Sequence, residues 1–397
     1  MVSASKSSGG SGPIRLGMVG GGQGAFIGGV HRIASRLDGE FVLVAGALSS
    51  DPERAKASAA ELGLDPARSY GSFQEMAKAE AARDDGIEAV AIVTPNHMHF
   101  APAKAFLAAG IHVICDKPLT STLAEAKKLV HLAESSASLF VLTHNYTGYP
   151  MVRQAREMVA SGELGDIRVV HVEYPQDWLT EKAEATGSKQ AEWRTDPKRS
   201  GAGGATGDIG THAYNLARFV TGLELDALAA DLDAFVDGRL VDDNAHVLLR
   251  FKAKGKARPA KGMLWASQVA PGNENALALR VYGTKGGLEW AQEQPNHLWY
   301  TPFGEPKRLI TRNGAGAGEA AARLSRIPPG HPEGYLEGFA NIYAEAARAI
   351  RAMRKKGGKI GKEVVFPTVR DGLEGVAFVD ACVRSSKKNG AWTKLSL

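Results

Sequence analysis

The sequence has little cysteine and no long apolar run, and each absence narrows the kind of protein it encodes. Only Cys115 and Cys382 occur in 397 residues, so we expect no disulfide framework and a reducing, cytoplasmic location. No run of about 18 apolar residues is present, which predicts no membrane span. Residues 1–12 are rich in serine and glycine and lack the apolar core of a secretory signal, so we expect a disordered tail.

The chain also lacks a strong excess of charge of one sign. The net charge is only +5, and the basic clusters at residues 252–261 and 351–362 are interrupted by glycine and alanine with few aromatics. This pattern is typical of a solvated surface and predicts no nucleic-acid partner. The length is sufficient for two ordinary domains.

The first 145 residues alternate short apolar runs with helical patterns. Apolar runs that are separated by helices indicate a doubly wound parallel sheet. We expect strands at residues 14–19, 41–47, 89–93, 111–115 and 139–143, with helices at 51–62, 72–80, 100–109 and 122–133.

After about residue 149 the pattern changes to a series of strands joined mostly by short turns. This predicts an α+β domain with an open, mostly antiparallel sheet. The expected strands are 167–174, 228–235, 244–251, 263–270, 276–282, 288–291 and 298–301, and the expected helices are 151–160, 334–354 and 368–388, with one more after the glycine-rich loop near 200–221. A long loop is expected at 313–332. The predicted domains are therefore residues 13–148 and 149–397.

The fourth apolar run leads directly into Asp116-Lys117-Pro118. Ligands of open α/β sheets lie at the carboxyl ends of the strands, and proline stiffens the turn. A lysine held there can hydrogen-bond an alcohol beside a cofactor. The alternative for Lys117 is a surface lysine at the end of a strand.

A glycine-rich loop follows the first apolar run and suits a dinucleotide phosphate. Gly20, Gly22 and Ala25 form a G-x-G-x-x-A pattern, in which glycines allow close approach of the backbone to a pyrophosphate. The loop also contains Gln23, Gly24 and Phe26 as candidate cofactor contacts. A merely flexible turn is the alternative.

The end of the second strand leaves the choice between NAD and NADP open. Ser50 occupies the position where an acid usually binds the adenosine ribose, and Ser49 precedes it. Serine does not repel a 2′-phosphate, and Arg54 follows one helical turn later. Asp51 either binds the ribose or caps the next helix. We therefore lean slightly towards NADP or dual use.

The third strand ends in Thr94-Pro95-Asn96, followed by His99, which we expect at the same rim as Lys117. His99 could instead bond to backbone at the start of a helix.

Asp208 and His212 form a second group of candidate catalytic residues. They lie four residues apart after a glycine-rich loop. On a helix this spacing places both on one face. A carboxylate can orient an imidazole, and histidine is a suitable general base for alcohol oxidation. A helix cap with an incidental histidine is the alternative. The sequence shows no third ligand at a spacing that fits a metal, so we expect no metal site here.

Taken together and in this order, these motifs resemble the glucose–fructose oxidoreductase / inositol dehydrogenase / MocA (Gfo/Idh/MocA) family over nearly the whole chain. The resemblance rests on the glycine loop, Thr94-Pro95-Asn96-x-x-His99, the Lys117-Pro118 turn, Asn145-Tyr146 and Asp208-x-x-x-His212. It implies a Rossmann domain and a second domain whose open sheet forms homodimers or homotetramers.

The resemblance also implies roles for individual residues. Lys117 would contact the substrate and the nicotinamide ribose, His212 would accept the proton, and Asp208 would orient the base or the substrate. Further cofactor contacts would come from Asp116, Asn145 and Arg194, and substrate contacts from Tyr146, Gln176, Trp178, Asn215 and Tyr335. Tyr146 and Tyr335 could equally belong to the core.

Three departures from the family pattern stand out. Asp116 replaces the usual glutamate, and Asn215 replaces an acid that many members carry. His31 falls later than the comparable family histidine, which suggests an insertion at residues 26–28 of the glycine loop.

The predicted function is an NAD(P)-dependent dehydrogenase acting on a hydroxyl of a sugar, polyol or cyclitol. Two alternatives share the fold: an NAD-dependent glycoside hydrolase and a non-catalytic dinucleotide or sugar sensor.

Overall fold

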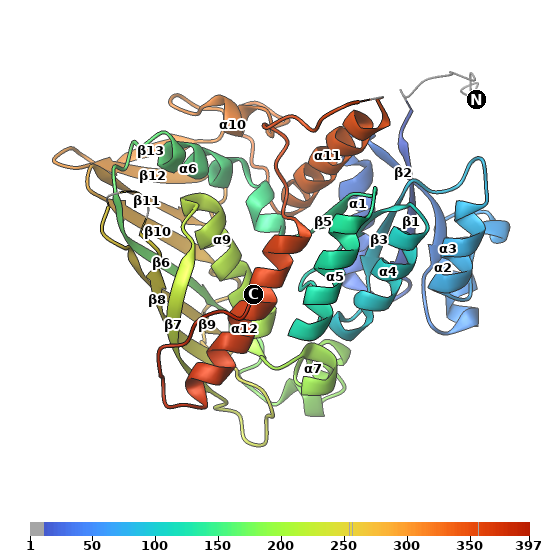
Figure 1. Ribbon diagram of the computed structural model, residues 1–397, viewed down its shortest axis with the longest axis horizontal. Coiled ribbons are helices and arrows are strands. Elements are labelled where there is room, and N and C mark those ends of the chain that lie inside the picture. The colour runs from blue at the N-terminus through green and yellow to red at the C-terminus, as the bar shows by residue number, and fades with distance from the viewer. Residues whose placement is uncertain (1–11, 254, 256, 356) are drawn as a thin grey trace.

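A computed structural model describes residues 12–397 except 254, 256 and 356, so the predicted tail lies almost wholly outside the described residues. Two sheets lie side by side with helices packed around and between them (Figure 1). No described helix is long and apolar enough to cross a membrane.

The first sheet has five parallel strands in the order β2-β1-β3-β4-β5, as expected of a doubly wound fold. Its central strand β3 is buried along its whole length, because helices cover both faces. The strands are β1 (Ile14–Gly20), β2 (Phe41–Ala47), β3 (Ala89–Val93), β4 (His112–Cys115) and β5 (Phe140–Leu142). The helices between them are α1 (Phe26–Leu37), α2 (Pro52–Glu61), α3 (Phe73–Ala81), α4 (Phe100–Ala108) and α5 (Leu123–Ser135).

The second sheet has eight strands in the order β13-β12-β11-β10-β6-β9-β8-β7 and is antiparallel except between β6 and β9. The strands are β6 (Ile167–Pro175), β7 (Leu225–Asp233), β8 (Asn244–Phe251), β9 (Lys261–Ser267), β10 (Ala278–Gly283), β11 (Gly286–Ala291), β12 (His297–Pro302) and β13 (Arg308–Thr311). The sequence pattern missed β13, which is short and half-exposed at the edge of the sheet.

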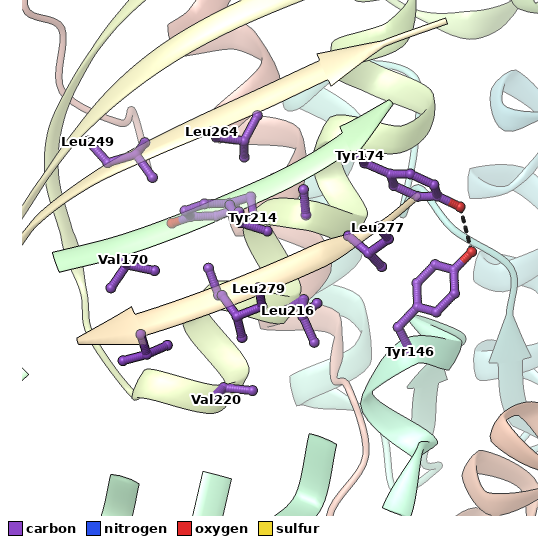
Figure 2. Packing of buried hydrophobic residues seen from close by; sticks show 14 of the residues in the cluster. Tyr146, Val170, Tyr174, Tyr214, Leu216, Val220, Leu249, Leu264, Leu277 and Leu279 are labelled. Carbon is purple, nitrogen blue, oxygen red and sulfur yellow. Dashed lines mark hydrogen bonds between the residues drawn. The ribbon is translucent and has the colours of Figure 1, made fainter. Parts of the chain in front are cut away.

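One face of the second sheet is covered by helices α6 (Pro150–Ala160), α9 (Thr211–Thr221) and α12 (Val369–Ser386) (Figure 1). Leucine and valine side chains from β6, β8, β9, β10 and α9 interdigitate in this core, as Figure 2 shows. The short helices are α7 (Lys189–Arg194), α8 (Pro197–Ser200), α10 (Glu319–Ala322), η1 (Pro66–Arg68), η2 (Asn96–Met98), η3 (Asn145–Gly148) and η4 (Ala183–Ala185), and Thr206–Gly210 (η5) forms a π turn.

Helix α11 (Tyr335–Arg354) returns to the first sheet after the second sheet is complete. Its Phe339 and Tyr343 share a buried cluster with Ile14 and Leu16 of β1. The predicted division at residue 149 remains a prediction, and late segments of the chain contribute to the core of the first sheet.

The glycine loop is arranged differently from the predicted G-x-G-x-x-A pattern. Ala25 is the residue before α1, and it is Gly28 that packs against the loop: a Cβ at Gly28 would lie 2.3 Å from the Gly21 carbonyl oxygen. Close approach of helix to loop is the role of the third fingerprint glycine. Gly28, the third residue of α1, therefore makes this close contact in place of Ala25.

This packing predicts opposite effects for two neighbouring alanine substitutions. Gly28→Ala should lower the free energy of unfolding by about 1–3 kcal/mol, as overpacking does, and weaken dinucleotide binding. Gly29→Ala is the matched control, because its Cβ would meet nothing closer than 3.9 Å. It should be neutral or stabilising by up to about 1 kcal/mol. Denaturant unfolding and NADH fluorescence titration measure both, and equal behaviour of the two variants would contradict the assignment.

Candidate active site

Lys117 joins the two sheets. It follows β4, and Pro118 comes directly after it. Its Nζ donates to the Asp208 carboxylate at 2.9 Å and to the Asp208 carbonyl oxygen at 2.5 Å. Asp208 lies in the π turn, a widened turn that is frequent at functional sites. The turn presents both oxygens to the lysine, so residues 91 positions apart meet at one point.

The Asp208 carboxylate accepts hydrogen bonds from three side chains. Besides Lys117, Arg194 donates to Oδ2 at 3.0 Å and Gln268 donates to the same atom at 3.0 Å. Burial alone would raise the pKa of Asp208, but the charges of Lys117 and Arg194 outweigh it and hold the pKa well below its usual range. Asp208 was expected to orient the base or the substrate, which remains a prediction; in the structure its carboxylate is bonded to the two cations and Gln268.

His212 lies in α9 as a buried, uncharged imidazole. Rings surround it: the centroids of Tyr146, His144 and Tyr174 are 4.8, 5.3 and 6.3 Å away. Burial, followed by the charge of Lys117, places the pKa of His212 well below its ordinary 6.5. The neutral ring can accept a proton, and its buried Nδ1 has no hydrogen-bond partner among the described residues.

A row of polar side chains borders His212 at the edge of the hydrophobic core. The hydroxyls of Tyr146 and Tyr174 face each other in a hydrogen bond (Figure 2). Asn275 Oδ1 accepts from the Tyr174 hydroxyl at 2.7 Å and from Gln176 Nε2 at 2.8 Å. Trp178 Nε1 donates to Gln176 at 3.1 Å. These bonds join all five side chains in one network suited to hydroxyl-bearing ligands.

The remaining predicted contacts lie around this row. The Arg194 guanidinium is 5.9 Å from the Trp178 ring centre, so the two share one wall. Asn215 is buried on α9, three residues after His212. Tyr335 packs edge-on against Phe339 at 5.2 Å, in the core cluster of the first sheet.

The glycine loop forms a cradle that side chains would fill. Gly20 has φ +77°, in the left-handed region that glycine tolerates, and a Cβ at Gly22 would lie 2.6 Å from Ser58 Oγ. The Gln23 backbone N–H donates to Ser58 Oγ at 3.0 Å, which ties the loop to α2. A hollow of about 440 Å³ adjoins the loop, lined among others by Gly24, Ala25, Phe26 and Arg32. The cradle fits the close approach of a pyrophosphate.

The end of β2 offers no carboxylate dedicated to the ribose. Asp51 caps α2, because its Oδ1 accepts from the Arg54 N–H at 2.7 Å. Ser49 Oγ accepts from the Asp51 N–H at 3.1 Å, and Ser50 and Arg54 are exposed.

His99 holds backbone rather than cofactor. One ring nitrogen lies 2.7 Å from the Pro118 carbonyl oxygen and the other 2.8 Å from that of Thr94. The ring therefore supports the Lys117-Pro118 turn, as the alternative interpretation had it, and its contact with the cofactor remains a prediction. Asn96 reaches the second domain, where its Nδ2 donates to the Ser200 carbonyl oxygen at 3.0 Å.

Asp116 is a partly buried carboxylate that directly precedes Lys117. It accepts from the Thr143 hydroxyl at 2.8 Å, and its Oδ1 lies 3.8 Å from Nε2 of His31. The Tyr343 hydroxyl lies 2.8 Å from the other nitrogen of His31. Burial would raise the pKa of Asp116, but His31 and Lys117 lower it to about 2. Asp116 thus belongs to the support of the site.

Two further polar atoms at the site have no partner within the described part of the chain. These are Nδ2 of Asn145 and Nδ1 of His144, both buried at the end of β5. Buried polar groups are normally hydrogen-bonded, so such atoms suit a bound ligand. With the glycine cradle, they fit a dinucleotide, for which Asn145 would supply a hydrogen bond.

Sequence reasoning missed Gln268, Tyr174, Asn275 and His144. Gln268 and Gln176 follow the ends of β9 and β6, which pair in parallel, so both lie at the same edge of the sheet. Polar residues after two neighbouring strand ends were the available signal, but it required knowing that this one pair is parallel.

Comparisons with known proteins agree with this geometry. A family model described as "Oxidoreductase family, NAD-binding Rossmann fold" matches residues 14–144, and "GFO/IDH/MocA C-terminal domain" matches residues 152–289. An oxidoreductase from Sinorhizobium meliloti is 66% identical, with a TM-score of 0.88 over 97% of this chain and 100% of that one.

Two relatives carry more specific descriptions. An inositol dehydrogenase homolog from Azotobacter vinelandii, solved with NAD+, is 36% identical with a TM-score of 0.93, covering 99% of this chain and 100% of that one. Levoglucosan dehydrogenase from Pseudarthrobacter phenanthrenivorans is 28% identical over 96% of this chain and 97% of its own. With two family domains matched in order and a cradle that fits NAD or NADP, the chain belongs to the Gfo/Idh/MocA family of oxidoreductases.

Proposed function

We propose that the protein is an NAD(P)-dependent dehydrogenase that oxidises a ring hydroxyl of a cyclitol or sugar. The observation that carries this proposal is the meeting of Lys117 and Asp208 across the two sheets, one helical turn from a neutral His212. An ammonium donor and a proton acceptor beside one another are the groups that alcohol oxidation requires.

Each residue then has a distinct task. His212 accepts the hydroxyl proton as the carbinol hydrogen departs as hydride, for which the bound dinucleotide supplies the acceptor. Lys117 uses two donors on Asp208, and its remaining N–H is available to polarise the substrate oxygen. Asp208 stays ionised and balances the charges of Lys117 and Arg194.

The substrate class follows from the polar row. Tyr174, Asn275 and Gln176 present hydroxyl and amide groups that can both donate and accept hydrogen bonds. A substrate with several hydroxyls can exchange hydrogen bonds with such a row, and Trp178 offers an aromatic face. A relative named levoglucosan dehydrogenase and an inositol dehydrogenase homolog solved with NADH and myo-inositol support the same class.

A substrate panel with matched variants tests the proposal. Inositols and sugars, each with NAD and NADP separately, should yield reduced nicotinamide absorbance for at least one pair. His212→Ala and Lys117→Ala should lower kcat by about 100-fold or more, since each removes an acid–base or polarising group. NADH binding, measured by fluorescence, should change by less than about threefold if neither residue dominates dinucleotide affinity. Unchanged turnover in both variants would refute these roles, and turnover without net NADH would favour the hydrolase.

The pH dependence follows from the depressed pKa of His212. Oxidation requires the neutral ring, and that fraction falls only as the pH drops through the folded pKa, which is below 6.5. With an uncharged cyclitol, kcat/KM for oxidation should therefore be governed by His212 only below pH 6.5. Lys117→Gln should move this acidic limb to higher pH, because it removes a charge that disfavours the imidazolium. An acidic limb at or above 6.5 in the wild type would contradict the assignment of His212.

We also propose that the protein is a homodimer or homotetramer through the second sheet. Helices cover only one face of this sheet, as Figure 1 shows. The other face exposes a register pair, Leu248 and Met263, each half-exposed, together with Trp299 and Leu309. These side chains form two exposed apolar pairs, on β8–β9 and on β12–β13, with β6, β10 and β11 between them. Exposed apolar side chains on an uncovered sheet face are typical of an interface with another copy.

Charge introduced on that face should dissociate the assembly. Leu248→Glu combined with Met263→Glu would bury unpaired carboxylates at a shared interface, which disfavours association strongly. Light scattering after size exclusion should then give the monomer mass. Leu37→Glu is the control, because Leu37 is similarly exposed but lies on α1 of the first domain. A wild-type protein that is itself monomeric at micromolar concentration would exclude the proposed assembly.

A further inference from the structure

The π turn that carries Asp208 is capped by a carboxylate from a distant part of the chain. No side chain of its own N-cap residue, Ala205, caps it. Asp242 instead accepts from the Gly204 N–H at 2.8 Å and from the Thr206 N–H and hydroxyl at 2.8 and 2.7 Å. The Asp242 carbonyl oxygen accepts a fourth bond, from the Ala205 N–H at 2.8 Å.

The backbone of the turn fits closely against Asp242. A Cβ at Gly204 would lie 2.0 Å from the Asp242 carbonyl oxygen, so only glycine allows this contact. Asp242 is buried at the N-terminal end of the turn, and burial raises its pKa although the hydrogen bonds from Thr206 and Gly204 oppose that shift. The position of the turn is therefore determined by Asp242.

The next residue, Asp243, contacts Gln268, which is another hydrogen-bond partner of Asp208. The Asp243 carbonyl oxygen accepts from the Gln268 N–H at 2.8 Å, and the Gln268 side chain donates to Asp208. The Asp243 carboxylate is fully buried and bonded to Arg239 at 3.0 Å, and Arg239 also donates to the Leu179 carbonyl oxygen at 3.0 Å. Leu179 follows Trp178 in the wall of the polar row.

We propose that Asp242 and Asp243 are positioning residues for the proton-transfer site, with Asp242 orienting the turn that bears Asp208 and leads to His212, and Asp243 orienting Gln268. This rests on the dehydrogenase function proposed above. Neither residue touches the reacting atoms. Asp242 accepts four hydrogen bonds from the segment that leads into Asp208, and the Asp243 carbonyl oxygen accepts one from the Gln268 N–H.

Loosening the contacts between Asp242 and the turn should lower the reaction rate without changing dinucleotide affinity. Asp208 and His212 are carried on one continuous helical segment, so a tilt of the turn displaces both relative to Lys117. A misplacement of about 1 Å in such a site can cost about 100-fold in rate. Dinucleotide affinity depends on the glycine loop of the first sheet and should be unaffected.

A matched pair of threonine variants tests the positioning role. Thr206→Val removes the hydroxyl bond to Asp242 with little change in shape, and Thr206→Ser restores it. Thr368→Val is the control, because the Thr368 hydroxyl makes a bond of the same length, 2.7 Å, to Asp371 in the cap of α12. Both valine variants should lower the melting temperature, since each loses a cap hydrogen bond.

The expected results separate positioning from stability. Thr206→Val should lower kcat by about tenfold or more, as misplaced catalytic groups do, while KM for the cyclitol and Kd for NADH change less than about twofold if binding is uniform. Thr206→Ser and Thr368→Val should keep the wild-type kcat. Equal kcat in both valine variants, or a loss confined to KM, would overturn the proposal.

A readout without turnover keeps the test independent of the dehydrogenase function. NMR titration of the His212 ring in the NADH complex should show an upward pKa shift in Thr206→Val and none in Thr368→Val. A wild type that oxidises no member of the panel would refute the proposed function, whereas an unchanged His212 titration in Thr206→Val would refute the positioning role.

Discussion

The Asp208 carboxylate is the interaction on which the rest of the site depends. It binds Lys117 from the first sheet, Arg194 from α7 and Gln268 from the end of β9, at 2.9, 3.0 and 3.0 Å. A buried carboxylate is costly unless it is paired and hydrogen-bonded, and here each partner comes from a different part of the chain. The need to satisfy this charge therefore constrains how the two sheets meet.

The charges around the site give Asp208 and His212 different protonation states and therefore different tasks. The two cations keep Asp208 ionised, whereas burial and the charge of Lys117 keep His212 neutral. Titratable groups whose pKa values are pushed apart by their surroundings are typical of acid–base sites. The charge of Lys117 thus acts twice, as an anchor for Asp208 and as the reason that His212 can receive a proton.

Support for the site extends across both sheets. One ring nitrogen of His99 lies 2.7 Å from the Pro118 carbonyl oxygen of the lysine turn, and Asn96 reaches Ser200 in the second domain. On the far side, Asp242 caps the turn that presents Asp208. Each of these contacts uses backbone groups, whose positions are less variable than those of long side chains. The reacting groups are consequently held by secondary structure of both the first and the second domain.

Much of this protein follows from local sequence. The apolar periodicity correctly predicted the parallel sheet, and the order of motifs correctly predicted the family and an NAD or NADP cofactor. These features depend on residues close together in the chain, where spacing translates directly into strands, helices and turns. The i, i+4 spacing of Asp208 and His212 did not reveal that Lys117 and Arg194, from outside the helix, bind the carboxylate.

Only the tertiary structure decided which distant groups complete the site. The parallel pairing of β6 with β9 brings Gln268 to the edge that bears Gln176, and the return of the chain after β7 places Asp242 beneath the π turn. Gly28, not Ala25, packs against the glycine loop, because Ala25 lies before the first turn of α1. Strand order, register and the length of a loop are set by long-range packing, and no local pattern of residue types contains them.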